Sequence, residues 1–347
     1  EKSRGLGDVY KRQGHICTDL GMPFCTFARW RRMGLSGRSF GRPGPAKTEP
    51  FDEAVLQGHL RALRHGPKRS GGVGRLQRIY ASPQQPSLAG RVVDRSIFDG
   101  KRYSAIRPVQ IGRGCRFACD FCSIHAFYGK HLRQRPLGAF IAEVETFADR
   151  PMFLVDDNLF VNPGQAEALF RALKPLGAKW VCQISMDIAA DEALLDLMAE
   201  AGCVTALIGF ESLHPGNLKQ MGKRWNLKQG AYEAVIGRFR ERGMMLYATF
   251  VFGYDQDTPA SFDVTVDWAL RQKFCLANFN PLTPTPGARL YDRMRKEGRL
   301  LFDRWWLDPR FRYGDATFEP RGMTADELTR GCFEARRRFN TAGAIVR

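Results

Sequence analysis

Three of the nine cysteines lie close together in the sequence, and their thiols are the side chains best suited to metal chemistry. Cys115, Cys119 and Cys122 follow one another with C-x3-C-x2-C spacing, directly after a short apolar run. Three thiolates within one loop can hold a single metal centre, and iron–sulfur clusters are held by cysteine thiolates. Because the loop offers only three protein ligands, one iron of a four-iron cluster would stay open to an exogenous ligand.

Zinc is the alternative occupant of this loop. His125 lies three residues after Cys122, so the loop could form a closed Cys3His site, which would be structural and without redox chemistry. Three buried thiols without any metal are a third interpretation. The cysteine pattern alone leaves the cluster and the zinc ion comparable, and only the position of the loop in the fold favours the cluster.

The cysteine loop stands at the start of a regular alternation of strand-length apolar runs and helix-length amphipathic stretches. Proline follows a capping side chain at two helix starts, Asn162-Pro163 and Thr258-Pro259. Such alternation predicts parallel strands joined by crossover helices, an α/β fold. The predicted strands span residues 108–111, 152–155, 180–184, 205–208, 246–252 and 274–279, and the predicted helices span 137–148, 163–176, 191–201, 227–242 and 259–273.

Polar side chains follow nearly every predicted strand. In parallel α/β barrels the loops at the carboxyl ends of the strands build the active site. The cysteine loop follows the first strand, where reactive groups belong and a structural zinc would be unusual. We therefore expect one site that also includes Asp156, Asp157 and Asn158 after the second strand, Ser185 and Asp187 after the third, and Glu211 after the fourth.

The composition is that of an ordinary globular protein. Hydrophobic residues make up 44% and charged residues 26% of the 347 residues, which excludes a disordered chain. The longest apolar run, residues 244–252, is far shorter than the ~20 residues of a membrane span. No signal peptide opens the sequence, and six cysteines stand singly, so we expect a reducing, cytoplasmic location and no membrane span.

With these features the sequence resembles the radical S-adenosylmethionine (SAM) superfamily over about residues 107–340. It is most similar to enzymes with an N-terminal cobalamin-binding domain, a group that includes hopanoid C-methylases and the anaerobic magnesium-protoporphyrin ester cyclase. The resemblance implies a partial, open (β/α)6 barrel of the TIM type with a C-terminal helical extension. It rests on the segments GRGCRFACDFCSIHAFYG (112–129), FLVDDNLF (153–160), QISMDIA (183–189), LIGFESL (207–213), TFVFGYDQDT (249–258) and NPLTPTPGARLYDRMRKEGRL (280–300).

The resemblance also implies roles for single residues. Cys115, Cys119 and Cys122 would ligate a [4Fe–4S] cluster whose open iron binds the amino and carboxylate groups of SAM, and Phe121 would lie against the adenine. For Asp187 and Glu211, helix capping or pairing with Arg113 is the alternative. The implied cofactor-binding residues are Asp156, Asp157 and Asn158 near the methionine amino group, and Ser185, Asp187 and Glu211 at the ribose or the methionyl end.

The reaction that the resemblance implies is reductive cleavage of SAM to a 5′-deoxyadenosyl radical, which abstracts hydrogen from an organic substrate. Cobalamin-dependent C-methylation is the expected outcome, and oxidative cyclisation or rearrangement without methyl transfer is the alternative. We expect a small-molecule substrate that is hydrophobic, such as a polycyclic lipid or a tetrapyrrole, an electron donor such as flavodoxin or ferredoxin, and no nucleic-acid partner. A zinc-stabilised, basic nucleic-acid-binding protein is the rival from another class.

The net charge of +17 is concentrated near the N-terminus, where residues 1–75 contain 15 Lys and Arg against 6 Asp and Glu. Residues 8–13 resemble a translated sequencing adapter, so we expect residues 1–13 to be an artefact. Residues 14–100 are expected to be a remnant or linker of a missing cobalamin-binding domain, frame-shifted over 21–74, or else a native basic arm. The barrel is expected over 101–280, and residues 281–347 form an extension that covers the barrel edge or lines the substrate site.

Overall fold

The computed structural model describes residues 87–89, 95–96, 106–129, 131–160, 162–341 and 343–344. The expectations for residues 1–13 lie outside the described residues. So do those for residues 14–100, apart from the two short stretches above, and the proposed domain boundaries remain predictions.

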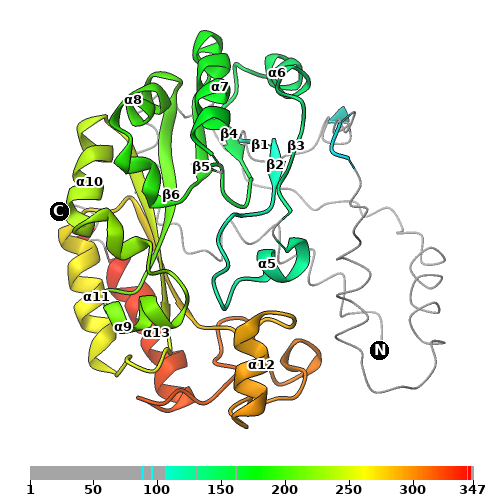
Figure 1. Cartoon of the computed structure of the whole chain (residues 1–347). Coiled ribbons are helices and arrows are strands. Elements are labelled where there is room, and N and C mark those ends of the chain that lie inside the picture. The colour runs from blue at the N-terminus through cyan, green and yellow to red at the C-terminus, as the bar shows by residue number, and fades with distance from the viewer. Residues whose placement is uncertain are drawn as a thin grey trace, which may run out of the picture.

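Six parallel strands form the main sheet, and within this sheet the strands lie side by side in the order in which they follow one another along the chain. Figure 1 shows this sheet as a curved, open wall with helices on its outer side. The α/β partial barrel predicted from the sequence is therefore confirmed. The strands, in sheet order, are β1 (Arg107–Val109), β4 (Met152–Leu154), β5 (Trp180–Gln183), β6 (Cys203–Glu211), β7 (Met245–Phe252) and β8 (Leu276–Pro281).

Five of the helices between the strands lie close to the predicted ranges. Asn162 caps α7 as expected, because its side chain accepts a hydrogen bond from the Gln165 amide at 2.8 Å and Pro163 follows it. The predicted helix over 227–242 is shorter in the structure and follows a separate 3-10 turn. The five helices are α6 (Leu137–Glu145), α7 (Pro163–Leu173), α8 (Glu192–Glu200), α10 (Tyr232–Glu241) and α11 (Ala260–Arg271).

Several short elements were not predicted. The strands β2 (Gly112–Arg113) and β3 (Arg133–Gln134) pair antiparallel on either side of the cysteine loop and of α5 (Ser123–Tyr128). Elements of two to six residues are too short to show a hydrophobic period in the sequence. The other such elements are η2 (Lys174–Leu176), η3 (Met186–Ala190), α9 (Pro215–Gln220) and η4 (Asn226–Gln229).

The two faces of the sheet differ in burial. Along β7 the side chains alternate, so that Leu246, Ala248, Phe250 and Phe252 are buried while the residues between them are partly exposed. The buried face packs on the helices, where Phe210, Phe250 and Trp268 form a cluster of rings with centroids about 6 Å apart. The partly exposed face is the concave inner wall of the barrel.

The C-terminal extension contributes α12 (Arg289–Lys296), η5 (Trp305–Leu307) and α13 (Ala325–Phe339). The capping box predicted at Thr324 is present, since its side chain and that of Glu327 each bond the other's backbone amide. Phe339 of α13 lies 5.6 Å from Phe279 of β8, between ring centroids, so α13 covers the last strand of the sheet. A Cβ at Gly331 would lie 2.2 Å from the Phe262 ring, which shows how closely α13 and α11 pack.

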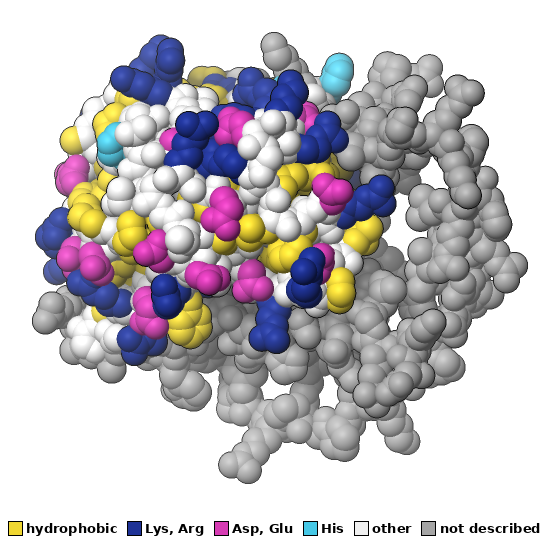
Figure 2. Space-filling model, turned by 90° about the horizontal axis from the view of Figure 1, so that it is seen from below, with side chains coloured by type: hydrophobic (Ala, Val, Ile, Leu, Met, Phe, Trp, Pro, Cys, Tyr) yellow, Lys and Arg dark blue, Asp and Glu magenta, His cyan; other side chains and the backbone are white. Residues whose placement is uncertain are grey.

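Charged side chains of both signs lie on the surface. Figure 2 shows one face, on which Lys and Arg are interspersed with Asp and Glu.

Candidate functional site

Two glycines, Gly112 and Gly114, connect the end of the first strand to the cysteine loop. Gly114 has φ +100°, and a Cβ there would lie 2.6 Å from the His131 carbonyl oxygen. A side chain at Gly112 would press on Asp156 Oδ1, 3.1 Å from the added Cβ. Glycine at these positions allows the chain to pass close to its neighbours and turn into the loop.

Asp156 and Asp157 hold the backbone at the entrance to this loop. The Asp156 carboxylate accepts hydrogen bonds from the Ile111 amide at 3.2 Å and from the Gly112 amide. Asp157 Oδ2 accepts one from the Gly114 amide at 2.7 Å. The two carboxylates that the resemblance placed near the methionine amino group therefore bond protein amides in this structure.

Asn158 and Ser185 join the second and third strand ends beside the first cysteine. The Asn158 amide nitrogen lies 3.7 Å from Cys115 Sγ and 3.1 Å from the Ser185 hydroxyl oxygen. Asn158 Oδ1 accepts a hydrogen bond from the Ser185 backbone amide at 3.1 Å. Both residues are buried, so the structure does bring these two predicted site residues to the cysteine loop.

Asp187 forms an ion pair with Arg116, a residue of the cysteine loop, and not with Arg113. The Arg113 guanidinium instead donates to the Gln110 side chain at 2.8 Å. Arg116 also lies over the ring of Phe160, 4.9 Å from its centroid. The second carboxylate oxygen of Asp187 is buried and has no hydrogen-bond partner among the described residues. A buried acceptor without a partner is rare in a folded protein and suits a ligand donor.

Glu211 pairs with a lysine that sequence reasoning missed. The Lys223 ammonium lies 2.8 Å from Glu211 Oε1 and 3.0 Å from the Gly209 carbonyl oxygen, and both charged residues are buried. Glu211 has φ 66°, a conformation uncommon for a residue with a side chain and concentrated at functional sites. Lys223 lies in a loop twelve residues after Glu211, and no periodic signal in the sequence links the two.

Electrostatic interactions join the thiols to this buried pair. Burial raises the pKa of Cys119 to about 12, whereas the Lys223 ammonium lowers it and the neighbouring Cys122, Glu211 and Cys115 raise it further. Burial also raises the pKa of Cys122. Without a positive partner these thiols stay protonated, so a bound metal centre would supply the charge that stabilises the thiolates.

The donor set of the loop fits a cluster better than a single ion. Cys115, Cys119 and Cys122 are all partly buried, and none forms a disulfide. Within the described part of the chain, no three His, Cys, Asp or Glu side chains are arranged to hold one metal ion. A [4Fe–4S] cluster would be held by the thiolates of these three cysteines.

Aromatic side chains flank the loop. Phe117 stacks on Trp225 with ring centroids 3.9 Å apart. Phe121, which the resemblance placed against an adenine, is partly buried and packs against the core. The contact of Phe121 with the adenine of SAM therefore stays a prediction.

The concave face beside the loop contains no charged side chain in its central rows. The pairing of β5, β6, β7 and β8 aligns one row of neighbouring residues across the sheet, Gln183, Leu207, Tyr247 and Leu276. The next row toward the carboxyl ends of the strands consists of Gly209, Thr249 and Asn278. Asn278 donates a hydrogen bond to the Tyr247 hydroxyl at 2.5 Å. The wall thus combines apolar side chains with a few neutral hydrogen-bonding groups, as small-molecule sites do.

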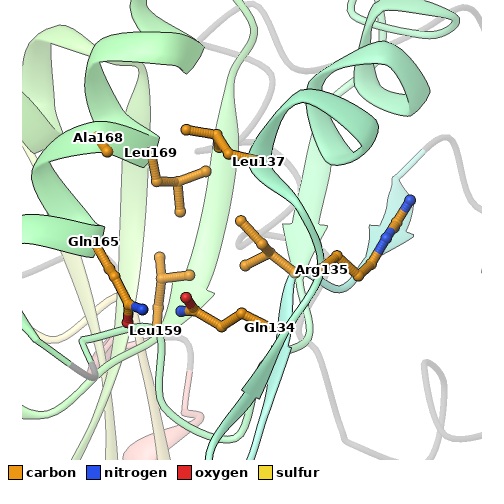
Figure 3. Close-up of a pocket in the computed structure, with 8 residues that line it drawn as sticks. Gln134, Arg135, Leu137, Leu159, Gln165, Ala168 and Leu169 are labelled. Carbon is orange, nitrogen blue, oxygen red and sulfur yellow. The ribbon is translucent and has the colours of Figure 1, made fainter. Parts of the chain in front are cut away.

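A separate pocket lies outside this wall, between β3, α6 and α7. Figure 3 shows Gln134 and Gln165 directed toward Leu159, while Arg135 points away. The lining residues are Ile111, Gln134, Arg135, Leu137, Leu159, Gln165, Ala168 and Leu169. None of them belongs to the cysteine loop or to the predicted site.

A parallel strand–helix sheet that presents three partly buried thiols after its first strand defines an α/β enzyme domain with a candidate iron–sulfur centre. Residues 109–269 match the model of the radical SAM superfamily, and the chain contains a radical SAM domain. The resemblance stated from the motifs is confirmed for this part of the chain.

Two relatives of known name match at the sequence level. The bacteriochlorophyllide d C-12(1)-methyltransferase of Chlorobaculum tepidum is 30% identical over 253 residues, which are 71% of this chain and 54% of that protein. The anaerobic magnesium-protoporphyrin IX monomethyl ester cyclase of Cereibacter sphaeroides is 26% identical over 245 residues, 68% of this chain and 39% of that protein. This chain therefore spans about half the length of these relatives or less.

A solved structure has the same fold. The radical S-adenosylmethionine methyltransferase TsrM of Kitasatospora setae, determined with cobalamin and a [4Fe–4S] cluster bound, superposes with a TM-score of 0.51 at 19% identity. The match covers 65% of this chain and 46% of TsrM.

Among the described residues, no helix is both long and apolar enough to cross a membrane.

Proposed function

We propose that the protein is a radical SAM enzyme whose [4Fe–4S] cluster is held by Cys115, Cys119 and Cys122, and that it methylates carbon with the help of cobalamin. The observation behind this proposal is the set of three partly buried thiols at the carboxyl edge of the sheet, beside the buried Lys223. When bound, the cluster and SAM supply the electron and the 5′-deoxyadenosyl radical that remove hydrogen from the substrate.

The contacts divide the proposed SAM-binding residues into two kinds. Asp156 and Asp157 are positioning residues, because their carboxylates bond the loop backbone. Asp187 is the better partner for the methionine amino group, since one of its oxygens is buried without a hydrogen bond among the described residues. Asn158, Ser185 and Glu211 lie beside the cysteine loop and Phe121 belongs to it, and these four residues complete the proposed SAM site.

Lys223 is added to this site as its buried cation. A SAM carboxylate and a cluster with thiolate ligands are both negatively charged, and an ammonium in a buried setting stabilises either one strongly. Glu211 keeps the ammonium in place at 2.8 Å. Before a negatively charged ligand binds, Glu211 balances the buried charge of Lys223, so the ammonium is not left unpaired.

The uncharged concave face is the proposed binding place of the substrate. Leu207, Leu276 and Val251 offer apolar contact, and Thr249 and Asn278 offer neutral hydrogen bonds. Charge is confined to the paired groups at the strand ends, so the surface suits a small, largely hydrophobic molecule.

Cyclisation without methyl transfer is the second candidate, because one relative is named a cyclase and another a methyltransferase. SAM labelled with deuterium in its methyl group separates the two reactions. A methylase transfers labelled methyl groups to its product, whereas a cyclase releases unlabelled product and forms 5′-deoxyadenosine.

The direct test of the proposal is 5′-deoxyadenosine formation by oxygen-free protein with dithionite and SAM. Cys119→Ala should abolish it, and Cys332→Ala, in α13, should leave it unchanged. Flavodoxin or ferredoxin is the proposed natural electron donor in place of dithionite. We also propose a cytoplasmic location, because unpaired cysteines and the thiolate ligands of a cluster persist in a reducing compartment.

A further inference from the structure

Helix α12 of the C-terminal extension touches the cysteine loop directly. The Arg289 guanidinium donates a hydrogen bond to the Ala118 carbonyl oxygen, and the Leu290 amide donates to the Asp120 carbonyl oxygen at 2.9 Å. These residues lie about 170 positions apart in the sequence. In Figure 1, α12 lies on the same side of the sheet as the loop and α5.

Asp120, between Cys119 and Phe121, is the centre of this contact. Its carboxylate accepts a hydrogen bond from the Tyr254 hydroxyl at 2.5 Å on one oxygen, and lies 3.0 Å from Arg293 Nη1 on the other. Its backbone amide donates to the Met221 carbonyl oxygen at 3.0 Å. The Asp120 side chain is only 8% exposed, so these partners replace water around a buried carboxylate.

Hydrogen bonds and one ion pair thus connect Asp120 to three different parts of the fold. Tyr254 follows β7, Arg293 and Leu290 belong to α12, and Met221 follows α9. The residue before Asp120 is Cys119, and Cys122 is two residues after it. Fixing Asp120 at several points therefore fixes the backbone that carries two of the three thiols.

We propose that Arg293 and Tyr254 are positioning residues of the metal centre, which act through Asp120 to hold the backbone that carries Cys119 and Cys122. The inference rests on the proposed function, because it assumes that these thiols bind a cluster. It assigns to the extension a role in the site in addition to covering β8.

The chain offers a matched control on the same helix. Arg295 is 57% exposed, and its ion partner is Asp292 at 3.8 Å, one turn away. Arg295→Gln removes the same charge from α12 as Arg293→Gln but leaves the loop contacts intact. Any difference between the two variants reports on the contact with Asp120.

The experiment compares wild type, Arg293→Gln, Tyr254→Phe and Arg295→Gln in the full chain. One measurement is hydrogen exchange of the loop amides of residues 116–122 in metal-free protein. The other is the rate at which an iron chelator removes iron from reconstituted protein. Arg293→Gln and Tyr254→Phe should exchange faster and lose iron about ten times faster, while Arg295→Gln should match wild type. Arg293→Lys, which keeps the charge, should restore part of the iron retention.

If Arg293→Gln and Arg295→Gln behave alike in both measurements, the inference is overturned. Should Arg293→Gln fail to fold, the comparison of Tyr254→Phe and Arg293→Lys with wild type still decides it, because both keep most of the local packing. If wild type itself takes up no iron, the proposed function fails, and the hydrogen-exchange comparison then shows separately whether α12 holds the loop.

Discussion

The Lys223 ammonium lies 2.8 Å from the Glu211 carboxylate, and both groups are buried next to the cysteine loop. A Cβ at Gly209 would lie 2.2 Å from Glu211 Oε1 and 2.9 Å from Lys223 Nζ, so only glycine leaves room for the pair. This ion pair links the end of β6 to the thiols through its electrostatic effect on Cys119 and Cys122.

Glu211→Gln should strongly destabilise the protein, because it leaves the Lys223 ammonium buried without a counter-charge. The expected loss in the free energy of unfolding is about 3–5 kcal/mol. Glu200→Gln is the control, since its pair with Lys174 is more than half exposed and should cost less than about 1 kcal/mol. Urea unfolding of both variants measures the difference, and equal losses would show that burial of the pair is unimportant.

Gly114→Ala should disturb the cysteine loop. Its φ of +100° is unfavourable for alanine by roughly 1–2 kcal/mol, and the new Cβ would meet the His131 carbonyl at 2.6 Å. Gly138→Ala in α6 meets nothing within 4 Å and should raise stability by up to about 1 kcal/mol. Thermal melting compares the two, and a stabilising effect of Gly114→Ala would contradict the described loop geometry.

The pH dependence of stability should reflect Asp156. Burial raises its pKa to about 7, although the Ile111 and Gly112 amides act to lower it. An unfolded Asp titrates near ~3.9, so between that pH and about 7 the folded protein binds more protons than the unfolded chain. The stability that protonated Asp156 contributes is therefore complete below about pH 4 and is lost as the pH rises through about 7.

Asp156→Asn should flatten this fall in the free energy of unfolding between about pH 5 and 8. Asp257→Asn offers a comparison, because burial raises the pKa of Asp257 to about 6. Replacing Asp257 should therefore change the free energy of unfolding at a lower pH than replacing Asp156 does. If wild type and Asp156→Asn show parallel pH profiles in urea unfolding, the carboxyl group does not titrate as described.

Asp187→Asn should weaken SAM binding about tenfold, because it removes the negative charge of a carboxylate that has one buried oxygen without a hydrogen-bond partner among the described residues. Equilibrium dialysis with labelled SAM measures the dissociation constant. Asp149→Asn, at a side chain 75% exposed, is the control and should bind SAM like wild type. Unchanged SAM affinity of Asp187→Asn would remove this residue from the proposed site.

The sequence was sufficient to predict the parts of the fold that local pattern encodes. The alternation of strands and helices, the Asn162 cap and the Thr324 capping box depend on residues only a few positions apart. The cysteine loop was equally visible, since its spacing is itself the signal. Polar residues at the strand ends could be gathered into one site because parallel strands end at one edge.

The contacts of those polar residues could not be predicted in the same way. Asp187 pairs with Arg116, 71 residues away, rather than with Arg113, and Lys223 reaches Glu211 from a loop without periodic pattern. The contact of Arg293 with Asp120 needs the extension to fold back over the barrel mouth. Such pairings depend on how whole elements pack, and neither propensity nor spacing encodes them.

The measurement that tests the account most directly is the iron, sulfide and zinc content of protein purified without oxygen, together with its visible spectrum. We expect about four irons and four sulfides per chain, as a [4Fe–4S] cluster requires, and their loss in Cys119→Ala but not in Cys332→Ala. One zinc and no sulfide, or an iron content that Cys119→Ala leaves unchanged, would contradict the proposed metal centre.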